Sequence, residues 1–434
     1  MTTQESFNAG QLDPTFGNNG IVTIDLPNGM SRFPSIVTFG TGAALKIYFA
    51  GWLVTTTPYT YVVGRLNRDG TPDKAFGNDG LITGLFAGQS AVVRSMAIQP
   101  DGKIILFAEQ NYGASFPCFA RFDSDGTLDK SFGTDGYTVL EIELAPPAPA
   151  SALDAKAPSS NSGASPFGVE ILPDGKILAF KHYTFGGTGG GSIGLIIRLN
   201  AEGLLDTDFN QIGYIGVIHP DYLHTATVLS DIMVQADGKY LGCGAVGNYV
   251  DPASAMFVRY DTEGNLDTSF GTKGNGFVTI EAPASTGGIG VQRMVQQPNQ
   301  RILGIGRANS QMGMMTSIEP DGTPNIQFNR GVPLITSLQD NAVTDWTGGA
   351  IQKDGKIVVV GTAGTVNGEA DIVVARFIDE KFDPAFNNGM GWVSTHVEDG
   401  TESATGVALQ DDGKILISAY TDSLGKALVL RYLA

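Results

Sequence analysis

The amino-acid sequence predicts an all-β protein made of repeated small sheets, and three observations lead to this prediction. A nine-residue motif, written LDKSFGTDG at Leu128–Gly136, recurs in seven copies along the 434 residues. Between the copies, apolar and β-branched runs of about four to eight residues alternate with Asp-Gly or Asn-Gly, as strands joined by tight turns do. The third observation is the tripeptide Asp-Gly-Lys, which occurs five times and always at the same place relative to the motif.

The phenylalanine of the motif sets the period of the repeat. Successive copies are 56 to 77 residues apart, and a recurrent spacing of this size indicates an array of structural units. The motif phenylalanines are Phe16, Phe76, Phe132, Phe209, Phe270, Phe328 and Phe386. We expect each ring to be buried between two units. The residue after it is always Gly or Asn, which predicts a positive φ angle there.

Each unit contains four predicted strands, and a four-stranded sheet cannot bury both of its faces alone. Seven such sheets arranged radially cover one another, as in a β-propeller. The chain starts with the motif and one strand, IVTIDL, and ends with three strands. We therefore predict one domain over residues 1–434, a seven-bladed β-propeller of four-stranded antiparallel blades. The N-terminal strand would pair with the three C-terminal strands and close the ring.

Two further positions of the repeat have predicted structural roles. The Asp-Gly-Lys sites predict two-residue hairpin turns in which both central residues have positive φ, and the lysine is interpreted as a solvated charge at a strand edge. Six units carry an arginine in the strand before the motif, and we expect it to contact the motif aspartate or turn carbonyls rather than a substrate. These arginines are Arg65, Arg121, Arg198, Arg259, Arg376 and Arg431, with Ser317 in the remaining unit.

The paired elements DGKI and LDxxFGxxG, at a spacing near 60 residues, resemble the delta-60 repeat family of bacterial proteins. The resemblance covers essentially the whole chain. It implies a propeller-like β fold and a bacterial source, often in large or surface-associated proteins, and it implies no reaction. The chain departs from the pattern at the first Asp-Gly-Lys site, at PNQR (Pro298–Arg301) and in the sixth motif copy, which affects only local turn geometry.

Composition narrows the classes of partner. Hydrophobic residues make up 42% of the chain and charged residues 16%, so we expect a folded protein with a sizeable core. The net charge of −17 repels phosphate backbones and anionic lipids, which disfavours nucleic acid as a partner. Cys118 and Cys243 are expected to be buried thiols. No apolar run approaches the roughly 18 residues of a membrane span, so we expect a soluble monomeric ring, cytoplasmic or exported without a cleavable leader.

Strand alternation places the Asp-Gly-Lys turns and the phenylalanine motifs on one face of the ring, which we call the motif face. The other two connections of each unit emerge on the opposite face, the variable face, and differ in every repeat. Loops on a rigid frame often carry binding residues, although unconstrained loops also drift. Aromatic residues there could bind a ligand or merely cap the blade cores. The candidates are Tyr59, Tyr112, Tyr183, Tyr222, Tyr249 and Trp346.

All four histidines lie in or beside the variable connections. A divalent cation site of His182, His219, Asp221 and His224 is conceivable, because imidazole and carboxylate suit zinc and related ions. Their spacing matches no known ligand pattern, so ordinary loop histidines are the alternative and no cofactor is indicated. Residues 145–166 are rich in Pro, Ala and Ser, which predicts a disordered loop.

The sequence favours a non-catalytic binding module that recognises a protein or another ligand, such as a glycan, through the variable face. A lectin-like, carbohydrate-binding propeller is one alternative, and a metal-dependent hydrolase or lactonase is another. An enzyme needs converging polar groups, and the predicted innermost strands begin near Arg94, Glu170, Asp231 and Arg293. Each of these occurs once and no spacing connects them, so we assign no catalytic residue.

Overall fold

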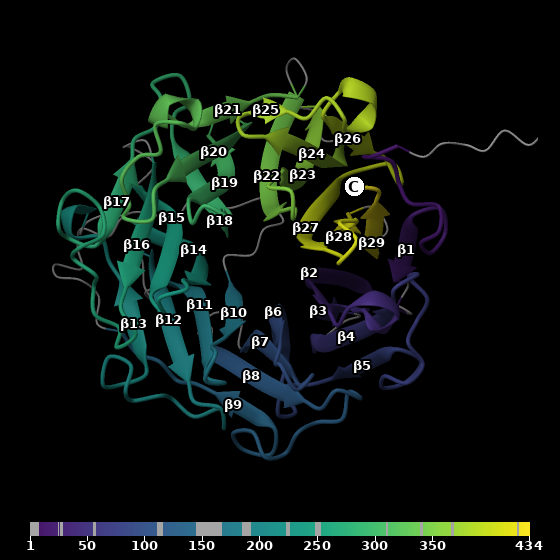
Figure 1. Cartoon of the computed structure of the whole chain (residues 1–434). Helices are drawn as coiled ribbons and strands as arrows, with labels where there is room; N and C mark the ends of the chain where they lie inside the picture. The colour runs from purple at the N-terminus through teal and green to yellow at the C-terminus, as the bar shows by residue number, and fades with distance from the viewer. Residues whose placement is uncertain are drawn as a thin grey trace, which may run out of the picture.

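The computed structural model shows seven sheets arranged around a central axis, with the chain running once around the ring (Figure 1). The structure describes residues 8–24, 26, 29–54, 58–110, 116–144, 167–184, 192–222, 226–247, 253–309, 311–338, 342–365, 369–422 and 425–434. The loop predicted at residues 145–166 lies outside these ranges. Within them, no helix is long and apolar enough to span a membrane.

Each blade has four antiparallel strands, ordered from the axis outward, so the predicted all-β, seven-bladed propeller is confirmed. Blades 1 and 2 contain β2 (Met30–Phe39), β3 (Lys46–Val54), β4 (Thr60–Asn67), β5 (Leu81–Gly84), β6 (Ala91–Ile98), β7 (Ile104–Gln110), β8 (Phe116–Phe122) and β9 (Tyr137–Val139). Blades 3 and 4 contain β10 (Gly168–Ile171), β11 (Ile177–Thr184), β12 (Ser192–Leu199), β13 (Tyr214–Val217), β14 (Ala226–Val234), β15 (Tyr240–Gly247), β16 (Ser254–Tyr260) and β17 (Phe277–Ile280).

Blades 5 to 7 follow the same plan, and blade 6 carries one additional short strand, β25. Blades 5 and 6 contain β18 (Ile289–Gln296), β19 (Ile302–Ala308), β20 (Met312–Ile318), β21 (Leu334–Thr336), β22 (Ala342–Ile351), β23 (Ile357–Thr365), β24 (Ala370–Ile378), β25 (Lys381–Phe382) and β26 (Trp392–Thr395). Blade 7 contains β27 (Glu402–Leu409), β28 (Ile415–Thr421), β29 (Ala427–Tyr432) and β1 (Ile21–Ile24).

The ring closes between segments from the two ends of the chain. β1 pairs antiparallel with β29, with Ile21 opposite Leu430 and Ile24 opposite Ala427. Figure 1 shows the purple β1 beside the yellow β29. The predicted closure is confirmed. It pairs the outer edge of β29, which would otherwise be open to another chain.

Among the described residues, seven large clusters form most of the hydrophobic core, and each fills the space between two neighbouring blades. Six of the motif phenylalanines are completely buried, and Phe328 is 4% exposed. The residue after each phenylalanine has a φ between 43° and 77°. Both predictions for the motif are confirmed. Burial of one such ring stabilises the fold by about 1.5–3 kcal/mol.

An arginine in the third strand contacts the motif aspartate in six blades, and in five of them it also bonds to a carbonyl of the next blade. In blade 2, Arg121 Nε donates to Asp129 Oδ2 at 2.7 Å and the guanidinium lies 4.9 Å from the Phe132 ring centre. Arg121 Nη1 also donates to the carbonyl of Ala201 in blade 3 at 2.6 Å. The predicted contact with the motif aspartate and a turn carbonyl is confirmed. The other five pairs, at 2.7–2.9 Å, are Arg65–Asp73, Arg198–Asp206, Arg259–Asp267, Arg376–Asp383 and Arg431–Asp13.

The lysine of the Asp-Gly-Lys site is partly exposed, as a solvated charge would be, but it also belongs to the same joint, which the sequence interpretation missed. Lys103 Nζ lies 2.9 Å from Asp129 Oδ2, because the hairpin places the start of the second strand beside the motif. Blade 1 lacks the Asp-Gly pair but keeps this contact, with Lys46 Nζ 2.9 Å from Asp73. The pairs Lys176–Asp206, Lys239–Asp267 and Lys414–Asp13 have the same distance.

The hairpin turn at these sites also differs from the prediction, because its loop has three residues rather than two. In blade 2, Gln99 N–H donates to the Lys103 carbonyl and Gly102 N–H donates to the Gln99 carbonyl, both at 2.8 Å. Gly102 has a φ of 86°, whereas Asp101 has no positive φ and accepts the Lys103 N–H through Oδ1 at 3.1 Å. This is a three-residue loop with glycine in the left-handed position.

Blade 5 lacks the arginine, and the aspartate and lysine of the charged joint are replaced there as well. Asn325 stands in place of the motif aspartate, and its Nδ2 donates to Ser317 Oγ at 3.0 Å. Arg301, in place of the lysine, pairs with Glu319 at 3.0 Å. Because both charged partners are replaced together, no buried charge is left without a counterion at this joint.

Candidate functional site

The direction of the strands divides the connections between the two faces as predicted. In blade 2, the turn from β6 to β7 and the motif between β8 and β9 lie on the motif face. The connections from β7 to β8 and from β9 to the next blade lie on the variable face, because antiparallel strands alternate in direction. Among the described residues, we compare three places as ligand sites: the larger cavity on the motif face, the central channel, and the strand ends on the variable face.

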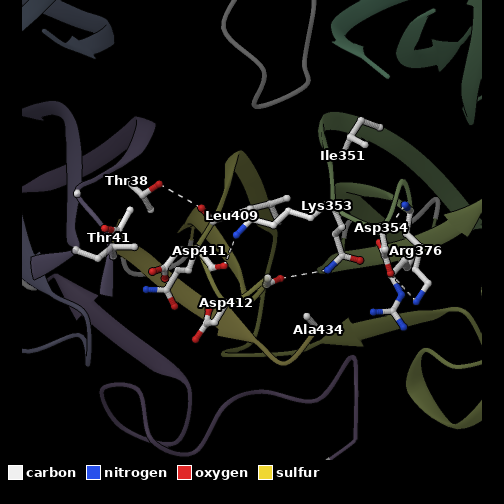
Figure 2. Close-up of a pocket in the computed structure, with 16 residues that line it drawn as sticks. Thr38, Thr41, Ile351, Lys353, Asp354, Arg376, Leu409, Asp411, Asp412 and Ala434 are labelled. Atoms are coloured by element: carbon white, nitrogen blue, oxygen red, sulfur yellow. Dashed lines mark hydrogen bonds and ion pairs between the residues drawn. The ribbon is translucent and has the colours of Figure 1, made fainter. Parts of the chain in front are cut away.

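The cavity on the motif face has a volume of about 740 Å³ and lies among the turns of blades 6, 7 and 1 (Figure 2). Its charged side chains connect these turns to one another. Lys353 Nζ donates to the Asp411 carbonyl at 2.7 Å, and Lys356 pairs with Asp354 at 3.0 Å. The Asp411 carboxylate accepts the Gly42 N–H at 2.6 Å. We assign this cavity to the scaffold because its charged groups already have structural partners.

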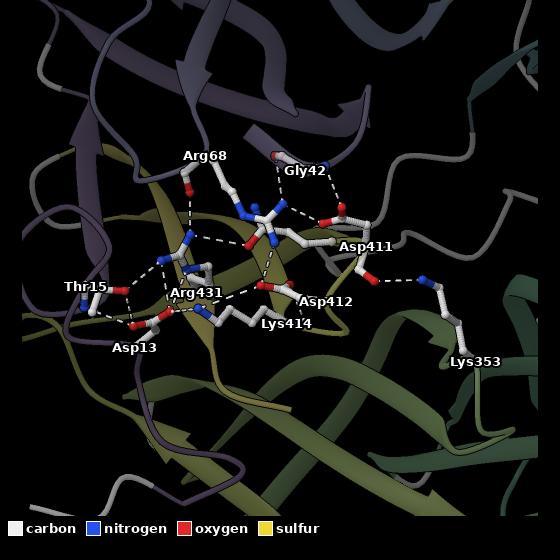
Figure 3. Close-up of polar contacts among 10 residues, drawn as sticks. Asp13, Thr15, Gly42, Arg68, Lys353, Asp411, Asp412, Lys414 and Arg431 are labelled. Carbon is white, nitrogen blue, oxygen red and sulfur yellow. Dashed lines mark hydrogen bonds and ion pairs between the residues drawn. The ribbon is translucent and has the colours of Figure 1, made fainter. Parts of the chain in front are cut away.

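Blade 7 meets blade 1 in a network of ion pairs on the same face (Figure 3). Arg68 of blade 1 reaches across the joint, and its two terminal nitrogens lie 2.6 Å from the carboxylates of Asp411 and Asp412. Arg68 Nη1 also donates to the Gly42 carbonyl in the turn between β2 and β3 of blade 1 at 3.0 Å. Arg68 places a blade-specific contact at the joint where the ring closes.

Asp13 is the centre of the same joint. It lies 2.9 Å from both Lys414 Nζ and Arg431 Nη2, and it accepts from the backbone and hydroxyl of Thr15. Burial alone would raise the pKa of Asp13, but the hydrogen bonds from Lys414 and Thr15 outweigh it and lower the pKa to about 2. The aspartate therefore remains charged at neutral pH and serves the structure.

The central channel contains a cavity of about 210 Å³ lined by the innermost strands of all seven blades. The structure brings the four charged residues expected near the innermost strands to this cavity: Arg94, Glu170, Asp231 and Arg293. Two are cationic and two are acidic. Threonine, serine, glycine and apolar residues form the rest of the lining.

Irregular pairing of the innermost strand directs some of these side chains, and sequence analysis did not predict it. In six blades the register between the first and second strands shifts at the same level, as between Val93 and Ser95 in blade 2. A β-bulge of this kind leaves a residue unpaired and turns the local side chains. Arg94 is such a residue, and so are Thr347 and Thr405.

Most polar groups in the channel hold neighbouring blades together. Thr347 Oγ1 donates to the Ala404 carbonyl at 2.9 Å, and Thr405 Oγ1 donates to the Phe33 carbonyl at 2.8 Å. Asp231 Oδ2 accepts the Met294 N–H of the next blade at 2.9 Å. These threonine hydroxyls are used in structural contacts and are poor candidates for nucleophiles.

Glu170 and Asp231 are the two acidic residues of the channel cavity, and Glu170 is the more exposed of them. It is open to the channel water, yet protein surrounds it on all sides. Burial, and secondarily the charge of Asp231, raise the pKa of Glu170 to about 7. Burial also raises the pKa of Asp231, although Arg293 works against it.

The predicted aromatic residues lie in different environments. Tyr59 is half-buried on the variable face with its ring centre 5.3 Å from that of Trp52. The Tyr183 hydroxyl donates to the Ile142 carbonyl at 3.4 Å, so this ring caps a blade interface. Tyr112 and Tyr249 lie outside the described residues. Tyr222 ends the 3-10 turn η3 (Pro220–Tyr222), and its side chain is not among the described groups.

The prediction that Trp346 binds a ligand is wrong. Trp346 is completely buried between blades 5 and 6, and its Nε1 donates to Thr336 Oγ1 at 2.8 Å. The sequence around it looks like a loop, but β22 already begins at Ala342 and directs the indole into the core. It cannot contact a ligand at the surface.

The prediction that His219 is the centre of a metal site is also wrong. His219 is completely buried; its Nδ1 accepts the Asp221 N–H at 3.2 Å, which leaves Nε2 to donate to Thr279 Oγ1 at 3.0 Å. Both ring nitrogens are therefore occupied. Asp221 is exposed and pairs with Lys273 at 3.3 Å, and His224 lies outside the described residues.

His182, the remaining candidate, is poorly suited to bind a proton. Its Nδ1 is buried and has no hydrogen-bond partner. Burial, with a contribution from the charge of Lys181, lowers the pKa of His182 to about 4. We assign it to the structure of blade 3.

A different group of potential metal ligands lies on the variable face where blade 6 meets blade 7. Asp371, His396 and Glu402 each have a ligand atom within 4.8 Å of the other two. Asp371 lies at the start of β24, His396 follows β26, and Glu402 begins β27. His396 was noted in the sequence only as a histidine in a variable connection, and no spacing linked it to the two carboxylates.

Comparison with known proteins agrees with the fold. A family model described as a β-propeller domain of unknown function (DUF5122) matches residues 99–132, 235–270 and 352–377, each of which begins at a hairpin turn. No curated protein matches the chain.

Solved structures with similar folds are distant. A protein of unknown function from Dyadobacter fermentans has 11% identity and a TM-score of 0.45, over 81% of this chain and 97% of the other. A puromycin-hydrolyzing peptidase from Mycobacterium tuberculosis has 12% identity and a TM-score of 0.46, over 99% of this chain and 57% of the other. A Hadza microbial sialidase has 10% identity and a TM-score of 0.45, over 98% of each chain. These similarities carry no activity over to the chain, whose match to the DUF5122 model supports a β-propeller family.

Proposed function

We propose that the protein is a non-catalytic binding module, a monomeric ring that recognises a protein or another ligand through its variable face. One observation carries the proposal: the repeated polar side chains are concentrated on the motif face, where they join the blades. Arg121, Asp129 and Lys103 illustrate this arrangement. The variable face carries side chains that occur once each. We also propose that the repeat is of the delta-60 type, since both of its motifs recur in order.

The size of the channel supports a binding surface rather than a deep pocket. Pockets for drug-sized molecules usually measure roughly 300–1,000 Å³. The channel cavity, at about 210 Å³, is smaller, and its threonines hold neighbouring blades together. A drug-sized or larger ligand at the variable end of the channel would therefore make most of its contacts with the strand ends and loops of that face.

A carbohydrate ligand is the second candidate, favoured by one observation. Trp52 and Tyr59 are both half-buried and lie edge to face on the variable side of blade 1, with ring planes at 73°. Partly exposed aromatic rings of this kind can stack on the apolar faces of sugars. Such a site would make the protein lectin-like.

The two candidates can be separated by screening the purified protein against a glycan array and against cell-surface protein extracts. Each screen is repeated with Trp52→Ala and Tyr59→Ala, and with Ile326→Ala as the matched control. Ile326 lies in a motif copy on the motif face and is 75% exposed. Glycan capture that both aromatic variants lose and the control keeps supports the lectin. Capture lost only by the control contradicts a variable binding face, and turnover of ester or lactone substrates contradicts a non-catalytic role.

A further inference from the structure

We propose that Asp371, His396 and Glu402 form a binding site for a divalent metal ion of the zinc type on the variable face. The three residues come from two blades: Asp371 and His396 belong to blade 6, and Glu402 begins the innermost strand of blade 7. An imidazole with two carboxylates is a donor set that suits zinc and related ions. The inference does not rest on the proposed binding function, because the metal alone is the probe.

The distances are close to those that a metal ion requires. The ligand atoms of the three side chains lie within 4.8 Å of one another. His396 Nδ1 and Asp371 Oδ1 are 3.1 Å apart. Zinc with ligands at about 2.0–2.2 Å in a tetrahedral arrangement separates neighbouring ligand atoms by about 3.3 Å. Metal binding would therefore draw the ligand atoms, now within 4.8 Å of one another, closer together by side-chain rotation.

Glu402 supplies the independent observation that points to a ligand. Its side chain is completely buried, and Oε1 accepts the backbone N–H groups of Val397 at 2.7 Å and Glu398 at 2.5 Å. Oε2 is also buried but has no hydrogen-bond partner. A buried carboxylate oxygen without a partner is unfavourable, and a bound cation would satisfy it.

Neighbouring groups hold the other ligands in place. Ser394 Oγ donates to Asp371 Oδ2 at 3.0 Å, which leaves Oδ1 directed at His396. Outer contacts of this kind orient metal ligands before the ion arrives. In the metal-free protein a proton on Nδ1 lies between His396 and Asp371, and the metal ion would take the place of that proton.

The surroundings favour a cation and leave a coordination position open. Asp399 lies 3.9 Å from His396 Nε2 and is fully exposed, so it adds negative charge without occupying the centre. The His396 side chain is 57% exposed. A water molecule, or a donor atom of a ligand on the variable face, could therefore complete the coordination shell.

The test is a titration of zinc into chelator-treated protein, followed by isothermal titration calorimetry. We expect one zinc ion per chain, and a dissociation constant that His396→Ala weakens by at least about tenfold. His396 is exposed, so this variant should fold like the wild type. Asp371→Asn and Glu402→Gln should weaken binding in the same way. His182→Ala, which changes a histidine in blade 3, is the matched control and should bind zinc as the wild type does.

Cobalt provides a second readout that does not depend on heat of binding. Cobalt bound by one imidazole and two carboxylates should give visible absorption bands, and the His396→Ala variant should lose them. No zinc binding by the wild type would overturn the proposal. Equal binding by the wild type and His396→Ala would overturn it as well, because the ion would then lie elsewhere.

Discussion

Asp129 and Glu402 show how differently the two faces of the ring treat a carboxylate. On the motif face, Arg121, Lys103 and the hydroxyl of Ser131 all contact Asp129. On the variable face, Glu402 has one oxygen held by backbone N–H groups and one buried oxygen without a partner. A side chain that is fully paired stabilises the fold, whereas one that is only half paired is available to a ligand.

The carboxyl pKa values also differ between the motif face and the rest of the ring. Burial alone would raise the pKa of each motif aspartate, but hydrogen bonds and neighbouring cations lower it in Asp13, Asp73, Asp129, Asp206, Asp267 and Asp383. Burial prevails away from the motif face, and the pKa values of Glu170, Asp231, Asp345 and Glu402 are raised. Raised carboxyl pKa values mark positions where the protein keeps an acid without fully compensating its charge.

The largest expected loss of stability comes from truncating a side chain that fills the interface between two blades. Phe132→Ala should lower the free energy of unfolding by about 3–5 kcal/mol, because it leaves a cavity between blades 2 and 3. Tyr59→Ala changes a half-buried residue on the variable face of blade 1, and it should lower the free energy of unfolding by much less. Denaturant unfolding of both variants measures the difference, and equal losses would contradict the division of the two faces.

Breaking one charged joint should have the next largest effect. Arg198→Ala leaves Asp206 buried without its arginine and removes the bond to the Thr262 carbonyl of blade 4. We expect a loss of about 3 kcal/mol. Arg68→Ala is the matched control, since its ion pairs with Asp411 and Asp412 are more exposed, and should cost about 1 kcal/mol or less. A larger loss in the control would show that the buried joints are not what holds the blades together.

Acid should weaken the joint where the ring closes. The pKa of Asp13 is lowered from 3.8 to about 2, so its stabilising contribution is complete above pH 3.8 and disappears as the pH falls through 2. The shift corresponds to about 2 kcal/mol. Asp13→Asn should therefore be less stable than the wild type at pH 7, and the difference should narrow toward zero near pH 1.5. A difference that stays constant with pH would contradict the assignment.

The effect on stability should be smallest in the channel, because water there screens the exposed Glu170, and its sign is opposite. The pKa of Glu170 is raised from 4.5 to about 7, so the folded protein favours the protonated acid. The charged form therefore destabilises the fold progressively as the pH rises from 4.5 to 7. Glu170→Gln should raise the Tm at pH 8 and leave it unchanged at pH 4. The opposite pH dependence would mean that the Glu170 carboxylate has a stabilising partner.

The ring could be predicted from the sequence because the same motif recurs in seven copies. The motif phenylalanine, the residue after it and the arginine partner of Asp129 recur in step, so each role could be inferred from the copies together. The role of Lys103 was missed, because its contact with Asp129 joins two turns that are separate in the sequence. Hairpin loop length depends on backbone geometry that Asp-Gly alone does not determine.

The candidate sites were harder to predict because each of their residues occurs once. Asp371, His396 and Glu402 come together only because three strand ends meet on the variable face. The β-bulge that directs Arg94 into the channel has no sequence signature of its own. Trp346 was taken for a loop residue because the start of β22 could not be located to within a few residues.

The most direct test of the two-face account measures stability and zinc affinity together in Arg198→Ala and His396→Ala. We expect Arg198→Ala to lose stability while its zinc affinity stays unchanged. His396→Ala should keep its stability in the absence of metal and lose zinc binding. If His396→Ala destabilises the metal-free ring as strongly as Arg198→Ala does, or if Arg198→Ala abolishes zinc binding while still folded, the two faces are not specialised in the way the structure indicates.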